Sequence, residues 1–301
     1  MPVLRKAEGS AQVIDGRAIA AQVRTEVAER ARKLAERGLT PGLAFFLVGE
    51  NPSSISYVRS KGDAAEEASI FSETFHLSES ISQEQLISHI MDVDEDPRFH
   101  AVLVQLPLPS HLDESAVVNA IDPTKDVDGI TPVNLGRLLR GEPCPHPATP
   151  AGVIELLHRT GNPPLGKHVV VCGRSNIVGK PIAGILMQKN PRANATVTIC
   201  HTATPNLADF TRRADILIVA MGSPAAITAD MVKPGAVVID VGNNWVPDAS
   251  RKSGRRLVGD VDFEGVSGVA GAITPVPGGV GPMTVAMLLS NTVALAERSL
   301  A

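Results

Sequence analysis

The chain has little that would suit it to nucleic acid, a membrane or an oxidising compartment. Its formal net charge is -4 at pH 7 and its basic residues form no block, so we expect no nucleic-acid partner. No apolar run reaches the length that spans a bilayer, and the first residues, MPVLRKAEGSAQVIDG, lack the apolar core of a secretory signal and suggest a short tail. Three scattered cysteines, an odd number without metal-ligand spacing, indicate a reducing compartment. We therefore expect a cytoplasmic protein without a membrane partner or a metal site.

The remaining composition is that of a globular protein. Hydrophobic residues make up 44% of the 301 residues and charged residues 20%, which excludes a disordered chain. A mass of 31.6 kDa allows two modest domains or one large one.

The first half of the chain alternates between helical and strand patterns. Apolar residues at helical spacing predict helices, one of which starts after Pro52 with Ser53 or Ser54 as its N-cap. Strands separated by helices indicate a parallel sheet. The predicted helices cover 15–37, 53–69 and 82–93, and the predicted strands cover 42–49, 70–77 and 101–109.

A segment rich in proline and glycine, 141–152, marks a boundary near the middle of the chain. Thr149 and Pro150 then suggest the N-cap and first residue of a helix that Gly161 ends. A second series of strands follows, at 168–175, 196–202, 215–222 and 236–244.

This pattern predicts an α/β protein with two α/β domains, the second a Rossmann-type nucleotide-binding domain, and a catalytic cleft between them. The predicted domains are 1–148 and 149–281. A last helix, 282–301, is too apolar to stand alone, so we expect it to complete the first domain.

The loop VVVCGRSNIVGKP, 169–181, leads from a strand into a helix. It does not match the three-glycine dinucleotide fingerprint. Gly173 would still allow a tight turn and Gly179 a close backbone approach, with phosphate at the helix N-terminus. The alternative is an ordinary strand-to-helix turn that contains glycine.

The coenzyme that this loop favours is NADP. Sites that prefer NAD usually carry an acid after the second strand, where this chain has Cys200, His201 and Thr202. Arg174 and Ser175 could instead meet a 2′-phosphate. His201 could join them, although a histidine at a strand end is as often a plain surface residue.

Three further segments carry candidate functional groups. Lys61 follows the only tyrosine, Tyr57, by one helical turn, so both side chains share a helix face. Either they form part of a site, or Lys61 is a solvated lysine beside a half-buried tyrosine. Gln105 ends a predicted strand, and DPTKDVDGIT (122–131) contains Asp126 and Asp128, either a site or a charged turn. The loop TPVPGGVGPMT (274–284), a shaped loop or a flexible linker, contains Pro277, Gly278, Gly279 and Gly281.

Together these segments resemble the bifunctional methylenetetrahydrofolate dehydrogenase/cyclohydrolase (FolD) family. The resemblance rests on five motifs in family order, from about residue 11 to the C-terminus. They are SxxYVxxK with Tyr57 and Lys61, VQLPLP with Gln105, KDVDG with Asp128, VGRSxIVGxP with Arg174, and PVPGGVGPMT; here the fourth begins CGRS.

The resemblance implies NADP-dependent oxidation of 5,10-methylenetetrahydrofolate and hydrolysis of the 5,10-methenyl product to 10-formyltetrahydrofolate, within one-carbon metabolism and purine biosynthesis. It implies that Tyr57 stacks on the aminobenzoate ring, that Lys61 lies at the reacting carbon with Gln105 bonded to it, and that Asp128 holds the pterin. Asp126 is expected to be structural. The PGGVGP loop would border the folate, with Gly279 and Gly281 there for close backbone approach, and the family implies a homodimer.

The sequence departs from the family pattern at Ala148, Trp245 and Ser69, none of them in the catalytic set. The alternatives are a monofunctional methylenetetrahydrofolate dehydrogenase, another two-domain NADP-dependent dehydrogenase of the shikimate type, and a folate-binding protein without activity. The intact pair of Lys61 and Gln105 favours the bifunctional enzyme over the first and the third. A shikimate-type dehydrogenase would explain the coenzyme half but not Tyr57, Lys61, Gln105 and Asp128 together.

Overall fold

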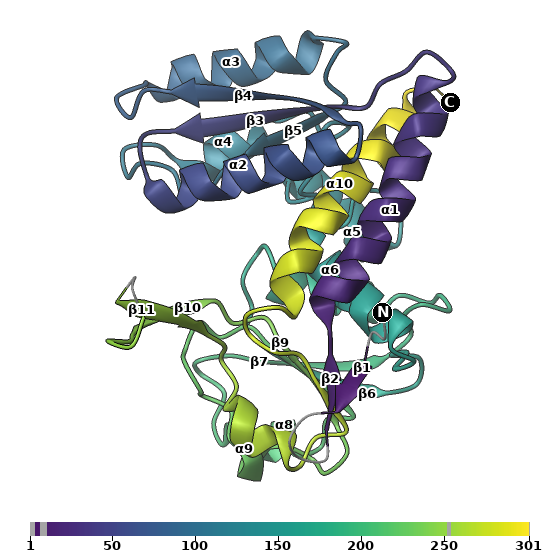
Figure 1. Ribbon diagram of the computed structural model, residues 1–301, viewed down its shortest axis with the longest axis vertical. Coiled ribbons are helices and arrows are strands. Elements are labelled where there is room, and N and C mark those ends of the chain that lie inside the picture. The colour runs from purple at the N-terminus through teal and green to yellow at the C-terminus, as the bar shows by residue number, and fades with distance from the viewer. Residues whose placement is uncertain (1–3, 7–10, 252–253, 301) are drawn as a thin grey trace. The chain divides into compact units, whose positions relative to one another are not determined.

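The computed structural model describes residues 4–6, 11–251 and 254–300 (Figure 1). These residues form two compact units, each with its own sheet, one parallel and the other mainly parallel. The three-stranded unit comprises residues from Gln22 to Ala148 and from Val285 onward. The seven-stranded unit comprises the residues up to Ala21 and Thr149–Thr284.

The prediction placed all of residues 1–148 in the first domain, and the structure differs at the start of the chain. Strand β2 (Gln12–Ile14) pairs in parallel with β12 (Ala272–Ile273), so it belongs to the sheet of the seven-stranded unit. The prediction of a tail is therefore wrong for β2 and for β1 (Leu4–Lys6), whereas residues 1–3 and 7–10 lie outside the described part of the chain.

In the three-stranded unit the strand order is β4-β3-β5 and both pairings are parallel, as predicted. Every residue of β3 is buried, which is typical of a central strand covered on both faces. Figure 1 shows α3 on one face of the sheet and α2 on the other. The strands are β3 (Gly42–Val48), β4 (Phe71–Leu77) and β5 (Ala101–Val104), and the helices that lie wholly in this unit are α2 (Pro52–Glu67), α3 (Gln83–Glu95), α4 (Glu114–Asn119) and α5 (Pro132–Arg140).

Local chemistry shifts two of the predicted boundaries in this unit. The N-cap of α2 is Asn51, whose side-chain oxygen accepts hydrogen bonds from the N–H groups of Ser53 and Ser54. The predicted serine caps are wrong because Pro52 is already the first helical residue. Strand β5 ends at Val104, and the predicted strand is wrong over 105–109 because prolines there cannot donate to a ladder.

Two long helices each have their larger part in this unit. Within it, α1 (Gly16–Ala35) and α10 (Val280–Arg298) lie side by side, and the Arg30 guanidinium binds the Glu297 carboxylate at 2.7 and 3.0 Å (Figure 1). By length and composition α10 could cross a membrane, contrary to the prediction that no segment could. Half of that window is buried inside the protein, as in the core helix of a globular domain.

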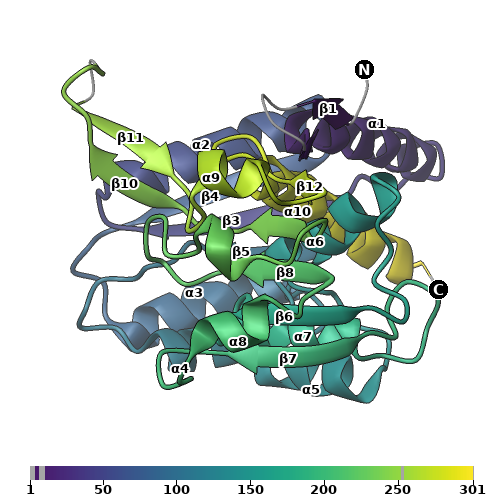
Figure 2. The same cartoon turned by 90° about the horizontal axis from the view of Figure 1, so that it is seen from below.

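In the seven-stranded unit the order is β1-β2-β12-β9-β8-β6-β7, and the β1–β2 pair is antiparallel. Figure 2 shows β7, β6 and β8 side by side. Strand β6 lies between β7 and β8, so the connection from β6 to β7 runs to one side of β6 and the connection from β7 to β8 crosses to its other side. Open α/β sheets bind ligands at such points, where the strand order reverses. The strands are β6 (His168–Cys172), β7 (Thr196–Cys200), β8 (Ile216–Val219) and β9 (Val237–Asp240).

The helices of this unit are short. The predicted N-cap at Thr149 is wrong, because α6 begins at Ala148 and the Thr149 hydroxyl instead lies 3.0 Å from the Thr284 hydroxyl. A hairpin, which the sequence prediction missed, projects from the unit in both views (Figures 1 and 2). The helices are α6 (Ala148–Arg159), α7 (Gly179–Leu186), α8 (Leu207–Thr211), the 3-10 helix η1 (Ala229–Met231) and α9 (Phe263–Ser267), and the hairpin strands are β10 (Asn244–Pro247) and β11 (Arg255–Val258).

One carboxyl in α3 links stability to pH. Burial first, and then the charge of Asp122, raises the pKa of Asp94 to about 6. The native state therefore binds a proton at Asp94 at a higher pH than the unfolded chain does, so Asp94 should add stability as the pH falls from 7.5 towards 4. In Asp94→Asn this contribution is absent.

We expect urea unfolding at several pH values to show the difference. The free energy of unfolding of Asp94→Asn minus that of the wild type should fall by about 1–3 kcal/mol between pH 7.5 and pH 4. Asp92→Asn, on the exposed face of the same helix, is the control. A pH-independent difference for Asp94→Asn would contradict the assignment.

Candidate active site

A lysine and a glutamine from different elements meet in the three-stranded unit. Lys61 lies on α2, and Gln105 directly follows β5, at the carboxyl end of the sheet. The Lys61 Nζ donates a hydrogen bond to the Gln105 Oε1 at 2.9 Å. The Gln105 side-chain amide in turn donates to the carbonyl of Leu106 at 2.7 Å, and its backbone N–H donates to Phe46 O at 2.9 Å. The bond to Leu106 fixes which end of the amide faces the lysine, so the lysine meets an oxygen without formal charge.

The surroundings of Lys61 disfavour its charged form compared with a lysine in water. Burial lowers the pKa of Lys61, and the carboxylate of Asp128 opposes this shift without cancelling it. Burial likewise raises the pKa of Asp128, against the effect of the Lys61 charge. The structure thus brings together Lys61, Gln105 and Asp128, three residues that the sequence prediction named for the folate site.

Tyr57 lies one turn before Lys61 on the same helix and leaves 47% of its surface exposed. Buried residues of the helix, such as Ser54 and Val58, lie next to Tyr57 and Lys61 at helical spacing, so Tyr57 is at the edge of the buried face. An accessible ring beside a buried amine can serve as a stacking surface for a planar ligand. This is the arrangement that the shared helix face predicted.

The loop that carries Asp128 is held by the neighbouring acid. Asp126 is 1% exposed, and its carboxylate accepts hydrogen bonds from Thr131 N at 2.8 Å, Asn134 Nδ2 at 2.9 Å and Ile130 N at 3.3 Å. Gly129, between the two ends of this network, has a φ of +62°. Asp126 therefore stabilises the loop, whereas Asp128 interacts with the charge of Lys61.

The predicted coenzyme loop lies at the switch point of the seven-stranded unit. Gly173 directly follows β6 with a φ of +132°, and a Cβ there would collide with the carbonyl oxygen of Ala220, which follows β8. A Cβ on Gly179 would collide with the backbone of Gly173, so Gly179 is required by packing of the loop on itself and Gly173 by packing against the segment after β8. Helix α7 begins at Gly179, and Val178 gives it no side-chain cap. Its first N–H groups are bonded within the loop, Gly179 N to Ser175 Oγ and Lys180 N to Ser175 O, and Pro181 has none, so the helix offers an anion its positive end rather than free donors.

The side chains proposed for the 2′-phosphate lie beside this loop. Arg174 is exposed, and the Ser175 Oγ accepts hydrogen bonds from Val178 N and Gly179 N at 3.2 and 3.4 Å while keeping its own hydrogen to donate. After β7, His201 Nδ1 accepts from Ala203 N at 3.2 Å, and Thr202 is exposed. These groups fit a phosphorylated coenzyme, because they offer one cation and several donors without a carboxylate among them.

The prediction missed a second loop at the switch point. The Asp260 carboxylate accepts hydrogen bonds from the N–H groups of Met221, Gly222 and Ser223, at 2.6 to 2.9 Å, and from Asn244 Nδ2 at 2.7 Å. Asp260 thereby fixes the loop after β8, opposite the coenzyme loop. Its separation from this loop in the sequence left no spacing that could have revealed the role.

The glycine-rich loop before α10 is closely packed at some positions and open at one. Gly278 has a φ of +110°, and a Cβ on Gly279 would meet Pro275 O at 2.6 Å. Pro277 precedes them in the same loop. Nothing in the described residues lies within 4 Å of a Cβ on Gly281, and its φ is not left-handed. The protein's own contacts therefore do not require a glycine at position 281, and the close approach of a folate to its backbone stays a prediction.

The chain matches two family models that together cover most of its length. Residues 14–128 match the catalytic domain of tetrahydrofolate dehydrogenase/cyclohydrolase, and residues 147–300 match the NAD(P)-binding domain of the same family. The first match includes Tyr57, Lys61, Gln105 and Asp128, and the second includes the coenzyme loop.

Relatives and solved structures agree with these matches. The chain is 52% identical to the bifunctional protein FolD of Chlorobium limicola over 95% of this chain and 98% of the relative, and 53% identical to that of Moorella thermoacetica over 96% and 99%. It superposes on FolD from Campylobacter jejuni with a TM-score of 0.89 at 45% identity, over 95% of this chain and 98% of that one. FolD of Trypanosoma brucei, solved with NADP and an inhibitor, gives 0.90 at 42% identity over 96% and 98%. The chain therefore belongs to the tetrahydrofolate dehydrogenase/cyclohydrolase family.

Proposed function

We propose that this protein is a bifunctional NADP-dependent methylenetetrahydrofolate dehydrogenase and methenyltetrahydrofolate cyclohydrolase. It oxidises 5,10-methylenetetrahydrofolate to the 5,10-methenyl cation and hydrolyses that cation to 10-formyltetrahydrofolate. Family membership over nearly the whole chain supports both activities. The observation that carries the second activity is the buried Lys61 amine held by the neutral amide oxygen of Gln105.

In the dehydrogenase step the chain's own residues bind and orient. NADP, when bound, supplies the hydride acceptor. The coenzyme loop with Gly173, Arg174, Ser175 and Gly179 would hold its phosphates, with His201 and Thr202 beside it. Tyr57 would position the aminobenzoate ring. No side chain needs to exchange a proton with the bridge carbon, so this step depends on alignment.

In the cyclohydrolase step a water oxygen bonds to the bridge carbon and the carbon–N5 bond breaks. N5 gains a proton, and one further proton leaves the water. Lys61 can accept the water proton because burial lowers its pKa towards the working range of a general base. The positive substrate would lower that pKa further, and Gln105 orients the amine without adding a negative charge.

We propose that Asp128 acts by binding the pterin rather than by moving a proton at the bridge. A carboxylate can accept two parallel N–H bonds, which suits the amino edge of a pterin. The Asp126 network supports this role, since it fixes the loop from which Asp128 projects.

Lys61→Met should separate the two activities. The substitution keeps the apolar stem and removes the amine, so we expect cyclohydrolase activity to fall by about 10²–10⁴-fold, as for a lost general base. Dehydrogenase activity should survive at a reduced level, with the methenyl species accumulating. Absorbance of the methenyl product and assay of the formyl product during turnover give both rates.

Asp128→Asn is the matched comparison, because it alters folate binding without removing the amine. Both activities should fall together in this variant. Hydrolysis of the methenyl species at the wild-type rate by Lys61→Met would rule out Lys61 as the base.

Gln105→Glu should shift the pH profile of the cyclohydrolase. A carboxylate at 2.9 Å from the amine would stabilise the ammonium and raise the pKa of Lys61. A base that must be neutral to act then works only at higher pH, so the ascending limb of the rate profile should move to more alkaline values. Gln105→Met, which removes the hydrogen bond without adding charge, should not move it in that direction. An unchanged limb in Gln105→Glu would contradict the proposal.

Arg174→Ala should change the choice of coenzyme. The loss of a charge-assisted bond to the 2′-phosphate should weaken NADP binding by about 1.5–3 kcal/mol while NAD binding changes little. Titration of each coenzyme by protein fluorescence or calorimetry measures both affinities. Lys189→Ala, an exposed lysine beyond α7, is the charge control. Equal losses for NADP and NAD would refute the role of Arg174.

We further propose that the protein is a cytoplasmic homodimer. Family resemblance supports the dimer, and three buried free cysteines support a reducing compartment. Light scattering on the eluting protein should give twice the chain mass, and a monomer mass would overturn the first of these proposals. Localisation of a fluorescent fusion tests the second.

A further inference from the structure

A pocket of about 620 Å³ lies in the three-stranded unit, where β5 begins. His100, which lines it, directly precedes β5, whereas Gln105 directly follows β5. The pocket is therefore separated from the Lys61–Gln105 pair by the length of the strand. Four parts of the unit form its walls. They are Leu39 in the segment after α1, the segment that includes Lys125, Arg137 on α5, and Arg298 at the end of α10.

The charged residues that line this pocket are all cationic. Lys125, Arg137 and Arg298 line it, and the described lining residues include no carboxylate. The three cations come from three separate segments, so their convergence is a property of the fold and not of a basic run in the sequence. Like charges brought together raise one another's energy unless an anion joins them.

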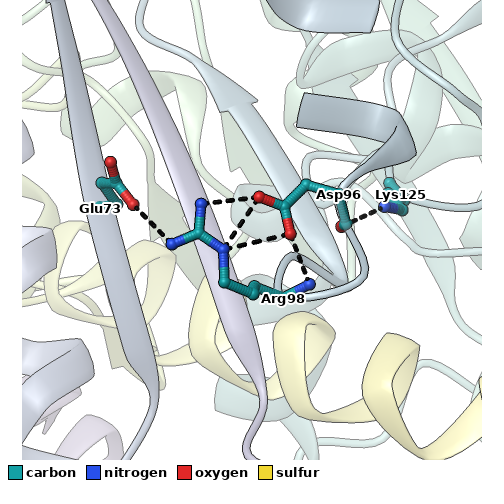
Figure 3. Close-up of polar contacts among 4 residues, drawn as sticks. All are labelled: Glu73, Asp96, Arg98 and Lys125. Carbon is teal, nitrogen blue, oxygen red and sulfur yellow. Dashed lines mark hydrogen bonds and ion pairs between the residues drawn. The ribbon is translucent and has the colours of Figure 1, made fainter. Parts of the chain in front are cut away.

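One acid near Lys125, Asp96, is engaged with another cation. Figure 3 shows the Asp96 carboxylate facing the guanidinium of Arg98, with distances of 2.7 and 2.9 Å, and Glu73 facing the same group. Within the described residues, the one hydrogen bond that the Lys125 Nζ donates goes to the backbone oxygen of Asp96, at 3.1 Å. Lys125 thus keeps two donor hydrogens and its charge beside the pocket.

Arg137, Arg298 and His100 can also donate hydrogen bonds to a ligand in the pocket. Arg137 makes one long bond, 3.4 Å, to Asn134 Oδ1, and within the described residues no carboxylate forms an ion pair with Arg137 or Arg298. His100 Nδ1 accepts from Gly42 N at 3.1 Å, so its hydrogen is on Nε2, and burial together with the Lys125 charge lowers its pKa. It is therefore a neutral donor at pH 7.

Apart from Thr124 and Ser299, the rest of the lining is apolar, with Leu39, Pro145 and Leu295 among it. A volume of about 620 Å³ is within the range of small-molecule sites, which combine apolar walls with a few convergent polar groups. We propose that this pocket binds a small organic anion, with its phosphate or carboxylate against Lys125, Arg137 and Arg298 and its apolar body against the leucines. The site is distinct from the folate and coenzyme residues.

Phenyl phosphate is a suitable probe, because it joins a ring to a divalent anion. Calorimetric titration into the full-length protein, with NADP at saturation to fill the other phosphate site, should show one site per chain. Inorganic phosphate and phenol, which are the two halves of the probe, should each bind more weakly. Arg298→Met and Lys125→Met should each weaken phenyl phosphate binding by about 10–100-fold, as expected for a lost charge-assisted bond.

Arg140→Met is the matched control, since Arg140 lies on the same helix as Arg137, is exposed and already pairs with Glu142. It should leave binding unchanged. Thermal unfolding shows whether each variant is folded, and the two test variants come from different segments, so loss of one leaves the other. Absence of binding by phenyl phosphate, or equal affinity in Arg298→Met and Arg140→Met, would overturn the proposal.

Discussion

The burial of the Lys61 amine against an uncharged oxygen is the constraint on which the candidate active site depends. In water a lysine is charged at neutral pH, and a carboxylate partner would keep it charged inside the protein as well. Gln105 supplies a hydrogen-bond acceptor with the reach of a glutamate but no formal charge, so burial can lower the pKa of the lysine. The carboxyl of Asp128 cannot cancel this effect, since burial also disfavours its own charge.

Each unit uses one acid to hold the backbone of a loop that carries functional groups. In the three-stranded unit Asp126 accepts three N–H bonds and fixes the segment from which Asp128 projects. In the seven-stranded unit Asp260 accepts four and fixes the loop after β8. A carboxylate has about four lone-pair sites, so one side chain can satisfy several loop N–H groups that regular structure leaves unpaired. Loops held in this way can place a ligand-binding group as reliably as a helix can.

The sequence allowed prediction of the features that depend on local pattern. Buried strands such as β3 are continuous apolar runs, and Lys61, Gln105 and Asp128 belong to short motifs whose chemistry is explicit in their side chains. Pairings between distant segments were not predictable. Strand β2 joins β12 from the other end of the chain, and no periodicity in QVI indicates this. Asp260 likewise acts on residues far from it in the sequence. The prediction of the N-cap of α2 was wrong for a different reason. Asn51 and Ser53 are both good N-cap residues, and only the position of Pro52 decides between them.

The coenzyme loop has an exposed cation, whereas the candidate folate site has a buried amine. The physical chemistry of each ligand explains this difference. A phosphate is ionised at neutral pH and strongly hydrated, so an exposed cation such as Arg174 and the Ser175 hydroxyl can bind it while water still screens the rest. Hydration of a methenyl cation instead requires an amine that can accept a proton, and the removal of water from around Lys61 lowers its pKa in that direction. This difference explains why the coenzyme loop is built from glycines that bring backbone close, whereas the lysine is on a packed helix against a strand end. A helix and a strand keep the buried amine at a fixed distance from its hydrogen-bond partner. A glycine-rich loop could do the same only if an acid held the loop in place.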